Sequence, residues 1–108
     1  MYFIISGYSQ SGTTSLYRYL ADHPQINPSK IKETNCLINF YEKKSCLNKN
    51  YNECFNESKC QIKLDASPAY MRHIDTFADN LNQLNEEFKV LLVIRNPVER
   101  AQTIFNKL

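Results

Sequence analysis

Two glycines and three hydroxyl residues near the start of the chain have a spacing that could bind an anion. Four residues separate Gly7 from Gly12, and Thr13, Thr14 and Ser15 follow directly. An apolar run precedes them and apolar residues at helical spacing follow, so the glycines fall in a strand-to-helix turn. The first N–H groups of a helix lack intrahelical partners and lie at the positive end of its dipole. The turn is therefore expected to bind a phosphate-like group, with simple N-capping as the alternative.

The same spacing narrows the kind of anion. It matches the triphosphate-binding loop G-x-x-x-x-G-K-[ST] except at one position, where Thr13 replaces the lysine. In triphosphate-binding loops that lysine reaches the β- and γ-phosphates. Its replacement favours a phosphate-like anion without triphosphate chemistry. A P-loop kinase or nucleotidase stays open as an alternative, for which Asp65 would be the candidate magnesium ligand.

The elements that must hold this turn alternate between strands and helices. Apolar, β-branched runs predict strands at residues 2–5, 62–65 and 89–95, the last an aliphatic run typical of a strand buried on both faces. Apolar periodicity predicts helices from after Gly12 to His23, from 32 to 41, from 74 to 88 and from Pro97 onward, with a loop at 25–32. This alternation predicts an α/β fold, a parallel sheet flanked by helices. Ligands bind at the carboxyl ends of such strands, which would bring the glycine turn, Ser67 and Arg95 to one edge.

Most of the cysteines lie in a polar, asparagine-rich segment, residues 43–61, which is expected to be an irregular surface loop. It holds Cys46, Cys54 and Cys60, and Cys36 lies just before it. No C-x-x-C pair occurs and the two histidines lie elsewhere in the sequence, so a zinc site is not expected. An even number of clustered cysteines predicts two disulfides with three pairings open, and four unlinked thiols are the alternative.

Length, charge and short motifs bound the class of protein. With 108 residues and a net charge of +2, the chain is one domain at most and does not favour nucleic acid as a partner. No apolar run is long enough for a membrane segment, and no signal peptide is visible. The sequence Asn56-Glu57-Ser58 is an N-glycosylation sequon. Together with the clustered cysteines it favours an oxidising secretory compartment. The expected location is the Golgi lumen if the sequence is part of a longer chain, and the cytoplasm otherwise.

Four segments together resemble one family of enzymes. They read SGTTSLYRYLADHP, KET, DASPAY and RNPVERAQTIF, and they occur in the family's order. They resemble the sulfotransferases that use 3′-phosphoadenosine 5′-phosphosulfate (PAPS), most closely the Golgi carbohydrate branch of the heparan sulfate type. The resemblance covers nearly the whole chain apart from the loop at about 43–61. It implies a P-loop-type parallel sheet and transfer of a sulfuryl group to a hydroxyl or amine of a carbohydrate acceptor, without a metal.

The resemblance also implies where the donor binds. The residues of the first loop would hold the 5′-phosphosulfate through backbone N–H groups and hydroxyls: Gln10, Ser11, Gly12, Thr13, Thr14 and Ser15. Arg95, at a strand end, would bind the 3′-phosphate of the same donor. Thr103 stands where the family usually has a serine that contacts this phosphate. A site that recognises both groups would select PAPS over ATP.

Glu33 matches the glutamate that heparan-type enzymes use as a general base. In that role it would take the proton from the acceptor hydroxyl or amine as this group attacks sulfur. An acidic residue in the first turn of a helix, stabilised by the helix dipole, is the alternative. Ser67 and Tyr70 match the family's S-P-x-Y turn, which shapes the site.

Three departures from the family pattern affect the expected activity. Gln10 stands where the family has a lysine or arginine that neutralises charge on the departing nucleotide, and losing such a charge costs on the order of 10²–10³ in rate. Ala66 replaces a lysine of the heparan-type branch. The chain also corresponds only to the amino-terminal half of the family's catalytic domain. A PAPS-binding relative with impaired catalysis is therefore the alternative, and the acceptor is not identified.

Overall fold

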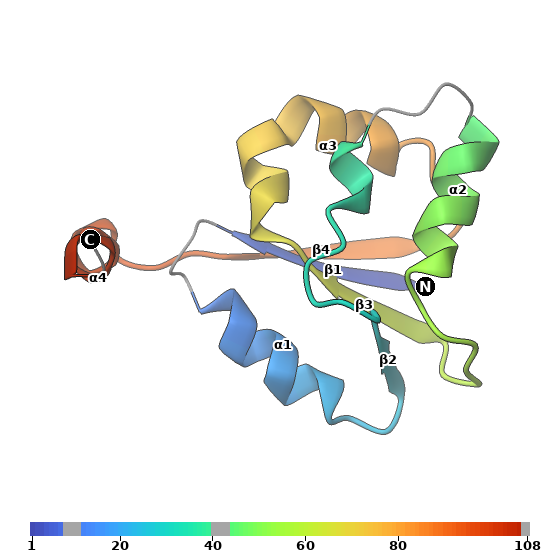
Figure 1. The fold of residues 1–108 in the computed structure, drawn as a ribbon, viewed down its shortest axis with the longest axis horizontal. Helices are drawn as coiled ribbons and strands as arrows, with labels where there is room; N and C mark the ends of the chain where they lie inside the picture. The colour runs from blue at the N-terminus through green and yellow to red at the C-terminus, as the bar shows by residue number, and fades with distance from the viewer. Residues whose placement is uncertain (8–11, 40–43, 107–108) are drawn as a thin grey trace.

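The computed structural model describes residues 1–7, 12–39 and 44–106. Its centre is a four-stranded parallel sheet in the order β2-β3-β1-β4 (Figure 1). The strands are β1 Tyr2–Gly7, β2 Ile26–Pro28, β3 Ile62–Ala66 and β4 Phe88–Val93. The α/β fold with a parallel sheet, predicted from the alternation of strands and helices, is confirmed.

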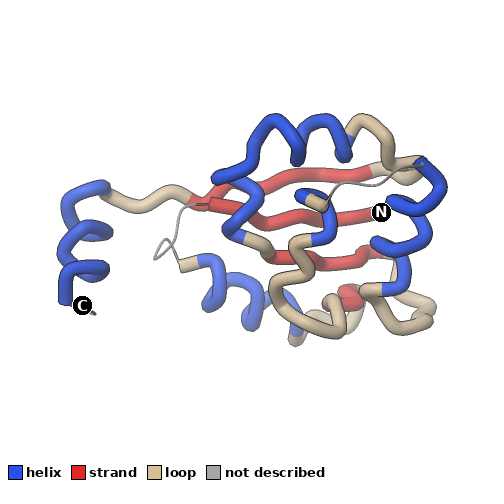
Figure 2. The backbone as a smooth tube through the Cα atoms, turned by 45° about the horizontal axis from the view of Figure 1, so that its top comes forward, coloured by secondary structure: helices blue, strands red, loops and turns tan. Residues whose placement is uncertain are grey.

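Helices lie on both faces of the sheet. The α-helices are α1 Thr13–Ala21, α2 Lys44–Glu53, α3 Ile74–Leu81 and α4 Pro97–Asn106, and the 3-10 helices are η1 Cys36–Ile38 and η2 Pro68–His73. Helix α1 covers one face, and α2 and α3 cover the other, as Figures 1 and 2 both show. Helix α4 projects from the end of β4 and stands apart from the sheet in both views.

The alternation of side chains along β1 divides the core between the two faces. Tyr2 and Ile4 belong to a cluster beneath α2 and α3, whereas Ile5 packs with Leu64 and Ala66 against α1. The larger cluster contains mainly aromatic and aliphatic side chains, which are Tyr2, Ile4, Cys36, Leu37, Leu47, Tyr51, Phe55, Tyr70 and Phe77. Both clusters hold β1 in place, and β1 carries the glycine turn at its end.

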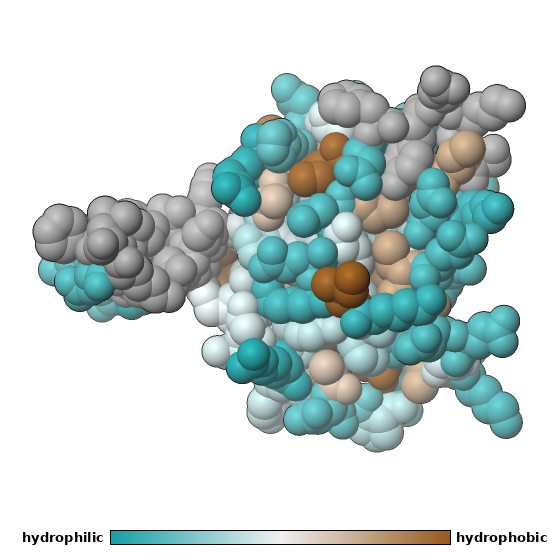
Figure 3. Space-filling view, in the orientation of Figure 1, coloured by the Kyte–Doolittle hydropathy of each residue, from teal (hydrophilic) through white to brown (hydrophobic). Residues whose placement is uncertain are grey.

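Helix α2 lies in the segment expected to be an irregular surface loop, so that prediction was wrong. Leu47, Tyr51 and Phe55 recur every fourth residue and are buried against the sheet. The ring of Tyr51 stacks on Tyr2 with centroids 4.4 Å apart. The side of α2 away from the sheet is hydrophilic (Figure 3). Its many polar residues concealed a single apolar stripe of helical period.

Other element boundaries also differ from the predictions. Residues 25–32 contain β2, which was expected to be loop, and a predicted helix at 32–41 is replaced by an extended loop and the short η1. Asn35, at the start of η1, has a left-handed backbone with φ of 52°. Helix α3 ends at Leu81, seven residues before its predicted end at 88.

Strand β4 is at the edge of the sheet and is largely exposed, although its sequence predicted burial on both faces. The two predicted disulfides are also not formed, since all four cysteines are thiols. Cys36 is buried in the core, whereas Cys46 is exposed and the Cys60 thiol donates to the Pro24 carbonyl at 3.2 Å. Among the described helices, none is both long enough and apolar enough to cross a membrane.

Candidate anion site at the carboxyl edge of the sheet

The carboxyl ends of β1, β3 and β4 meet at one edge of the sheet. Gly7, the last residue of β1, pairs with Val93, the last residue of β4. A Cβ atom on Gly7 would lie 2.3 Å from the Val93 carbonyl oxygen, so this close approach of the two strands requires glycine. The turn after β1 and the segment after β4 therefore start side by side.

The N-terminus of α1 follows the glycine turn and offers unpaired N–H groups. Gly12 is the N-cap residue, with φ of 91°, a left-handed conformation that favours glycine, and no side chain of the described residues caps the helix. Thr14 and Ser15 in the first turn are exposed, whereas Thr13 is buried. The first-turn amides and two hydroxyls are therefore available to an anion. The predicted site residues Gln10 and Ser11 lie outside the described residues.

Arg95 comes two residues after Val93, the β4 residue that pairs with Gly7. Its Nε lies 4.0 Å from Glu99 Oε2, and about a third of its side chain (36%) is exposed. Asn96 begins α4 by accepting hydrogen bonds from the amides of Val98 (2.9 Å) and Glu99 (3.3 Å), as its cap position predicted. Thr103 lies within α4, and its side chain is outside the described part of the structure.

Glu33 lies in the extended loop before η1 and not in a helix, so its proposed alternative role in a first helical turn is wrong. Its Oε1 accepts a hydrogen bond from Lys32 Nζ at 2.9 Å, and about half of its side chain is exposed. The Ala66 amide donates to the Lys32 carbonyl at 3.4 Å, which attaches this loop to the end of β3. Glu33 is therefore at the same sheet edge as the glycine turn, and its carboxylate is open to solvent.

The Ser67 turn joins the same edge. The Ser67 amide donates to the Ile5 carbonyl at 3.1 Å, and Ser6 Oγ donates to the Ser67 carbonyl at 3.0 Å. Both bonds attach the turn to the last residues of β1. At the level of the backbone, the structure brings together the end of β1, the Ser67 turn and the start of the segment that carries Arg95, as the fold class predicted. The Glu33 loop lies at the same edge, which the fold class did not predict.

A buried carboxylate at this edge was not assigned a structural role from the sequence. Asp65 is fully buried, and its oxygens accept hydrogen bonds from four hydroxyls, those of Tyr70 (2.6 Å), Tyr51 (2.9 Å), Ser67 (2.9 Å) and Thr34 (3.0 Å). Burial raises the pKa of Asp65, and the hydrogen bonds lower it and offset part of this effect. Both oxygens face hydroxyl donors, so Asp65 offers no open position for the magnesium ion of a kinase. The spacing D-x-S-x-x-Y was the only signal of this cluster in the sequence.

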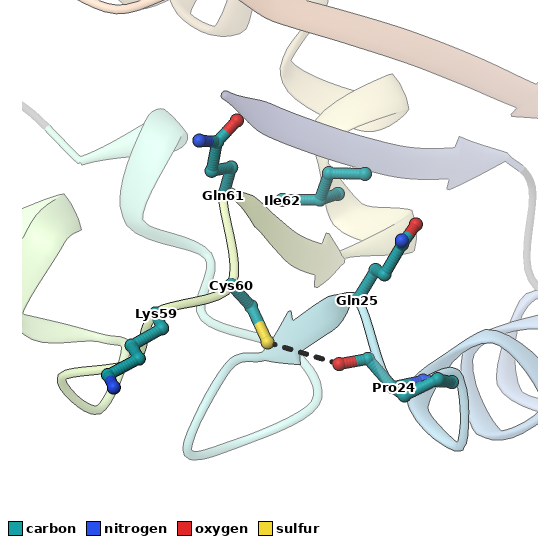
Figure 4. Close-up of a pocket in the computed structure, with 6 residues that line it drawn as sticks. All are labelled: Pro24, Gln25, Lys59, Cys60, Gln61 and Ile62. Carbon is teal, nitrogen blue, oxygen red and sulfur yellow. Dashed lines mark hydrogen bonds between the residues drawn. The ribbon is translucent and has the colours of Figure 1, made fainter.

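A cavity of about 430 Å³ lies at the opposite edge of the sheet (Figure 4). It is bounded by residues at the amino ends of β2 and β3: Pro24, Gln25, Lys59, Cys60, Gln61 and Ile62. It contains none of the predicted site residues. Among the side chains that line it, only that of Lys59 is charged.

Comparison with known proteins identifies what this geometry resembles. No protein-family model matches the sequence. The chain is 31% identical over 100 residues to the membrane-associated sulfotransferase kil1 of Dictyostelium discoideum, an alignment that covers 92% of this chain. Its structure matches the crystal structure of a sulfotransferase from Alicyclobacillus acidocaldarius with a TM-score of 0.66 and 27% identity over 98% of this chain. The chain belongs to the sulfotransferase family.

This sulfotransferase-family chain is shorter than both relatives. It spans 21% of the length of the Dictyostelium protein and 49% of the bacterial sulfotransferase chain. The sequence and structural matches confirm the family that the four sequence segments predicted, together with its fold. No group of three or more His, Cys, Asp or Glu side chains that could hold a metal ion occurs among the described residues.

Proposed function

We propose that the protein transfers a sulfuryl group from PAPS to a hydroxyl or amine of a carbohydrate acceptor. The observation that carries this proposal is the sheet edge itself. Three groups lie at the carboxyl ends of neighbouring strands in this chain of the sulfotransferase family. They are the N-terminus of α1, the segment that carries Arg95, and Glu33, whose side chain is about half exposed. Each of these groups suits one part of the donor or the acceptor.

The first-turn amides of α1 suit the 5′-phosphosulfate. They point along the helix axis at its positive end, and the exposed hydroxyls of Thr14 and Ser15 can donate further hydrogen bonds. At Gly12 a Cβ would have no heavy atom within 4 Å among the described residues beyond its chain neighbours. On this proposal Gln10 and Ser11 complete the loop.

Arg95 suits the 3′-phosphate of the same donor. A guanidinium presents two parallel N–H donors to phosphate oxygens. Arg95 is partly exposed and follows the strand that pairs with the glycine strand, so both phosphates of one nucleotide fall along a single edge. The Thr103 hydroxyl is proposed as a second contact to this phosphate.

Glu33 is proposed as the general base. Its carboxylate would take the proton of the acceptor hydroxyl or amine while that oxygen or nitrogen forms a bond to sulfur. The bond between sulfur and the bridging oxygen breaks, and 3′,5′-ADP leaves with the electron pair. Lys32 Nζ lies 2.9 Å from the Glu33 carboxylate and donates one hydrogen bond to it.

A PAPS-binding relative with impaired catalysis is the second candidate, and Gln10 is the observation that favours it. Restoring the family's cation with Gln10→Lys distinguishes the two functions in an assay of sulfate transfer. A gain on the order of 10²–10³ in rate identifies the wild type as impaired, because one preorganised charge at the leaving group has that value. Equal rates identify a competent wild-type enzyme.

A secretory location is proposed from the sequon. Asn56 is exposed and lies after α2, where an oligosaccharide could be attached without disturbing the core. The carbohydrate acceptor would be available in the Golgi lumen. Expression in a eukaryotic secretory host, followed by a mass measurement with and without glycosidase, tests this location through the Asn56→Gln variant.

The donor site is tested by calorimetric binding of 3′,5′-ADP and 5′-AMP to the wild type, Arg95→Ala and Lys89→Ala. Lys89 is the matched control, because it removes the same charge from an exposed position near the opposite end of β4. We expect Arg95→Ala to weaken 3′,5′-ADP binding by about tenfold or more and to change 5′-AMP binding by less than about twofold. Equal losses for both nucleotides, or no binding of 3′,5′-ADP to the wild type, would contradict the proposed function.

A further inference from the structure

A buried carboxylate, three hydroxyls and three backbone amides form a connected chain of hydrogen bonds behind Glu33. Asp65 accepts a hydrogen bond from each of the hydroxyls of Ser67, Tyr70 and Thr34. The same hydroxyl oxygens also accept hydrogen bonds from backbone amides in the segment that follows Glu33. Ser67 Oγ accepts from the Asn35 amide (3.2 Å), Thr34 Oγ1 from Cys36 (3.3 Å) and Tyr70 OH from Leu37 (3.4 Å).

The segment that these bonds hold adopts a conformation with a free-energy cost. Asn35 has φ of 52°, in the left-handed region that non-glycine residues occupy at a cost. Its side-chain Oδ1 is buried and has no hydrogen-bond partner among the described residues. Interactions elsewhere must offset both costs. The three amide contacts are directed at this segment, and Glu33 lies only two residues before Asn35.

The direction of each hydrogen bond depends on the charge of Asp65. Each hydroxyl has one proton, and it can leave its lone pairs to an amide N–H when that proton points at an acceptor. The carboxylate is the common acceptor of these protons. Burial beside Asp65 raises the pKa of the Tyr70 hydroxyl, which therefore keeps its proton and stays a donor. Without the carboxylate, the hydroxyls would lose the acceptor that orients them.

We propose that Asp65 is a positioning residue that acts through Ser67, Thr34 and Tyr70 to fix residues 33–37, and thereby holds the Glu33 backbone beside the acceptor. This proposal rests on the proposed role of Glu33 as the base, but the tether itself is independent of that role. Asp65 touches neither substrate nor donor. Its effect on the reaction is transmitted by three hydroxyls.

Two tyrosines provide a matched test of the tether. Tyr51 and Tyr70 are both fully buried, and both donate to the same carboxylate oxygen, at 2.9 Å and 2.6 Å. Only the Tyr70 hydroxyl also accepts a hydrogen bond from a backbone amide of the tethered segment. The Tyr51 hydroxyl contacts none of the amides of Asn35, Cys36 and Leu37. Tyr70→Phe and Tyr51→Phe therefore each remove one hydroxyl from Asp65, but only Tyr70→Phe removes an amide contact.

Amide hydrogen exchange of the whole chain measures the result. We expect Tyr70→Phe to increase exchange at Leu37 by about tenfold or more relative to Ile4 in β1, and Ser67→Ala to do the same at Asn35. Tyr51→Phe should leave these ratios within about twofold of the wild type. The Ile4 amide reports whether each variant is folded. Equal changes in the two tyrosine variants, or unchanged exchange in Tyr70→Phe and Ser67→Ala, would overturn the proposal.

A sulfate-transfer assay then connects the tether to Glu33. We expect Thr34→Val to lower kcat by about tenfold with 3′,5′-ADP affinity unchanged, and Thr34→Ser, which keeps the hydroxyl, to restore it. An equal loss of kcat in Thr34→Val and Thr34→Ser would show that the Thr34 hydroxyl is not the cause. If Glu33→Gln leaves transfer unchanged, the base assignment fails, and the exchange measurements still decide whether Asp65 fixes the loop.

Discussion

The two glycines near the start of the chain are needed for different physical reasons. Gly7 lets β1 and β4 approach, since its missing Cβ would lie 2.3 Å from a carbonyl oxygen of Val93. Gly12 has open space around it but a left-handed backbone with φ of 91°. One position is restricted by its neighbours and the other by its own dihedral angles. Alanine substitutions at the two glycines should therefore destabilise the fold for different reasons.

Gly12→Ala should destabilise the fold by about 1 kcal/mol, because a side chain in the left-handed region is strained while a less flexible unfolded chain offsets part of the cost. Urea unfolding measures this free energy. Gly7→Ala is the comparison and should cost more, since the strands must separate to relieve a contact with backbone. A neutral Gly12→Ala would mean that the α1 N-terminus does not require this backbone conformation.

Asp65 should give the stability a distinctive pH dependence. Burial makes the pKa of Asp65 higher in the folded protein than in the unfolded chain. Such a group contributes stability that is fully present below the unfolded pKa, about 3.9, and is lost as the pH rises through the folded pKa. Asp65→Asn cannot titrate, so the stability advantage of the wild type over this variant should shrink as the pH rises above about 4.

Urea unfolding of both proteins at several pH values measures this difference. Asp79→Asn, which changes an exposed aspartate on α3, is the control for the simple loss of a charge. An advantage of the wild type that grows with rising pH would show that the hydroxyls around Asp65 outweigh its burial. The sign of the slope therefore decides which effect dominates at this carboxylate.

At the scale of elements, the sequence predicted those whose patterns are local. The strands β1 and β3 and the helix α1 were found because apolar runs and glycine or proline boundaries mark them within a few residues. Helix α2 was missed because its apolar stripe of Leu47, Tyr51 and Phe55 has only one buried residue per turn, within a strongly polar segment. The predicted helix at 32–41 failed for a different reason. Its backbone amides donate to the hydroxyls of Ser67, between β3 and η2, and of Tyr70 in η2, which hold the segment in another conformation.

The position of helix α4 predicts that loss of its N-terminal cap destabilises only this helix. Asn96→Ala removes the side chain that accepts the amides of Val98 and Glu99, a cap with a value of about 1 kcal/mol. Because α4 stands apart from the sheet (Figure 2), we expect this loss to be confined to the helix. Amide exchange at Val98 and Glu99 should become faster, and the global unfolding midpoint should stay unchanged.

Asn106→Ala, at the other end of α4, is the matched control and should leave the Val98 and Glu99 amides unaffected. A shift of the global midpoint in Asn96→Ala would show instead that α4 unfolds together with the sheet. The result bears on the site, because α4 carries Thr103 and follows Arg95. A helix that opens independently could adjust when a phosphate binds.

At the scale of the whole molecule, the candidate site and the cavity of Figure 4 lie at opposite edges of the parallel sheet. The glycine turn, Ser67 and Arg95 were expected at one edge because each follows a predicted strand of a parallel sheet. The fold class did not place Glu33, since residues 25–32 were expected to be loop and the strand β2 was not predicted. It could not predict the burial of Asp65, because two of the four hydroxyls that surround this carboxylate, those of Thr34 and Tyr51, come from segments distant in sequence.

The exposed edge of β4 leads to a prediction about association. In the part of the chain that the structure describes, β4 pairs only with β1, and its Val90, Leu91 and Leu92 side chains are 39–46% exposed. An apolar edge strand with unpaired backbone groups favours pairing with another chain.

We expect the mass measured by light scattering for this chain to rise with protein concentration. Leu92→Lys should abolish that rise, because a charge opposes close strand pairing. Tyr19→Lys, which changes an 80% exposed residue on α1, is the control and should leave association intact. If Tyr19→Lys and Leu92→Lys act equally, general surface hydrophobicity and not the β4 edge controls association.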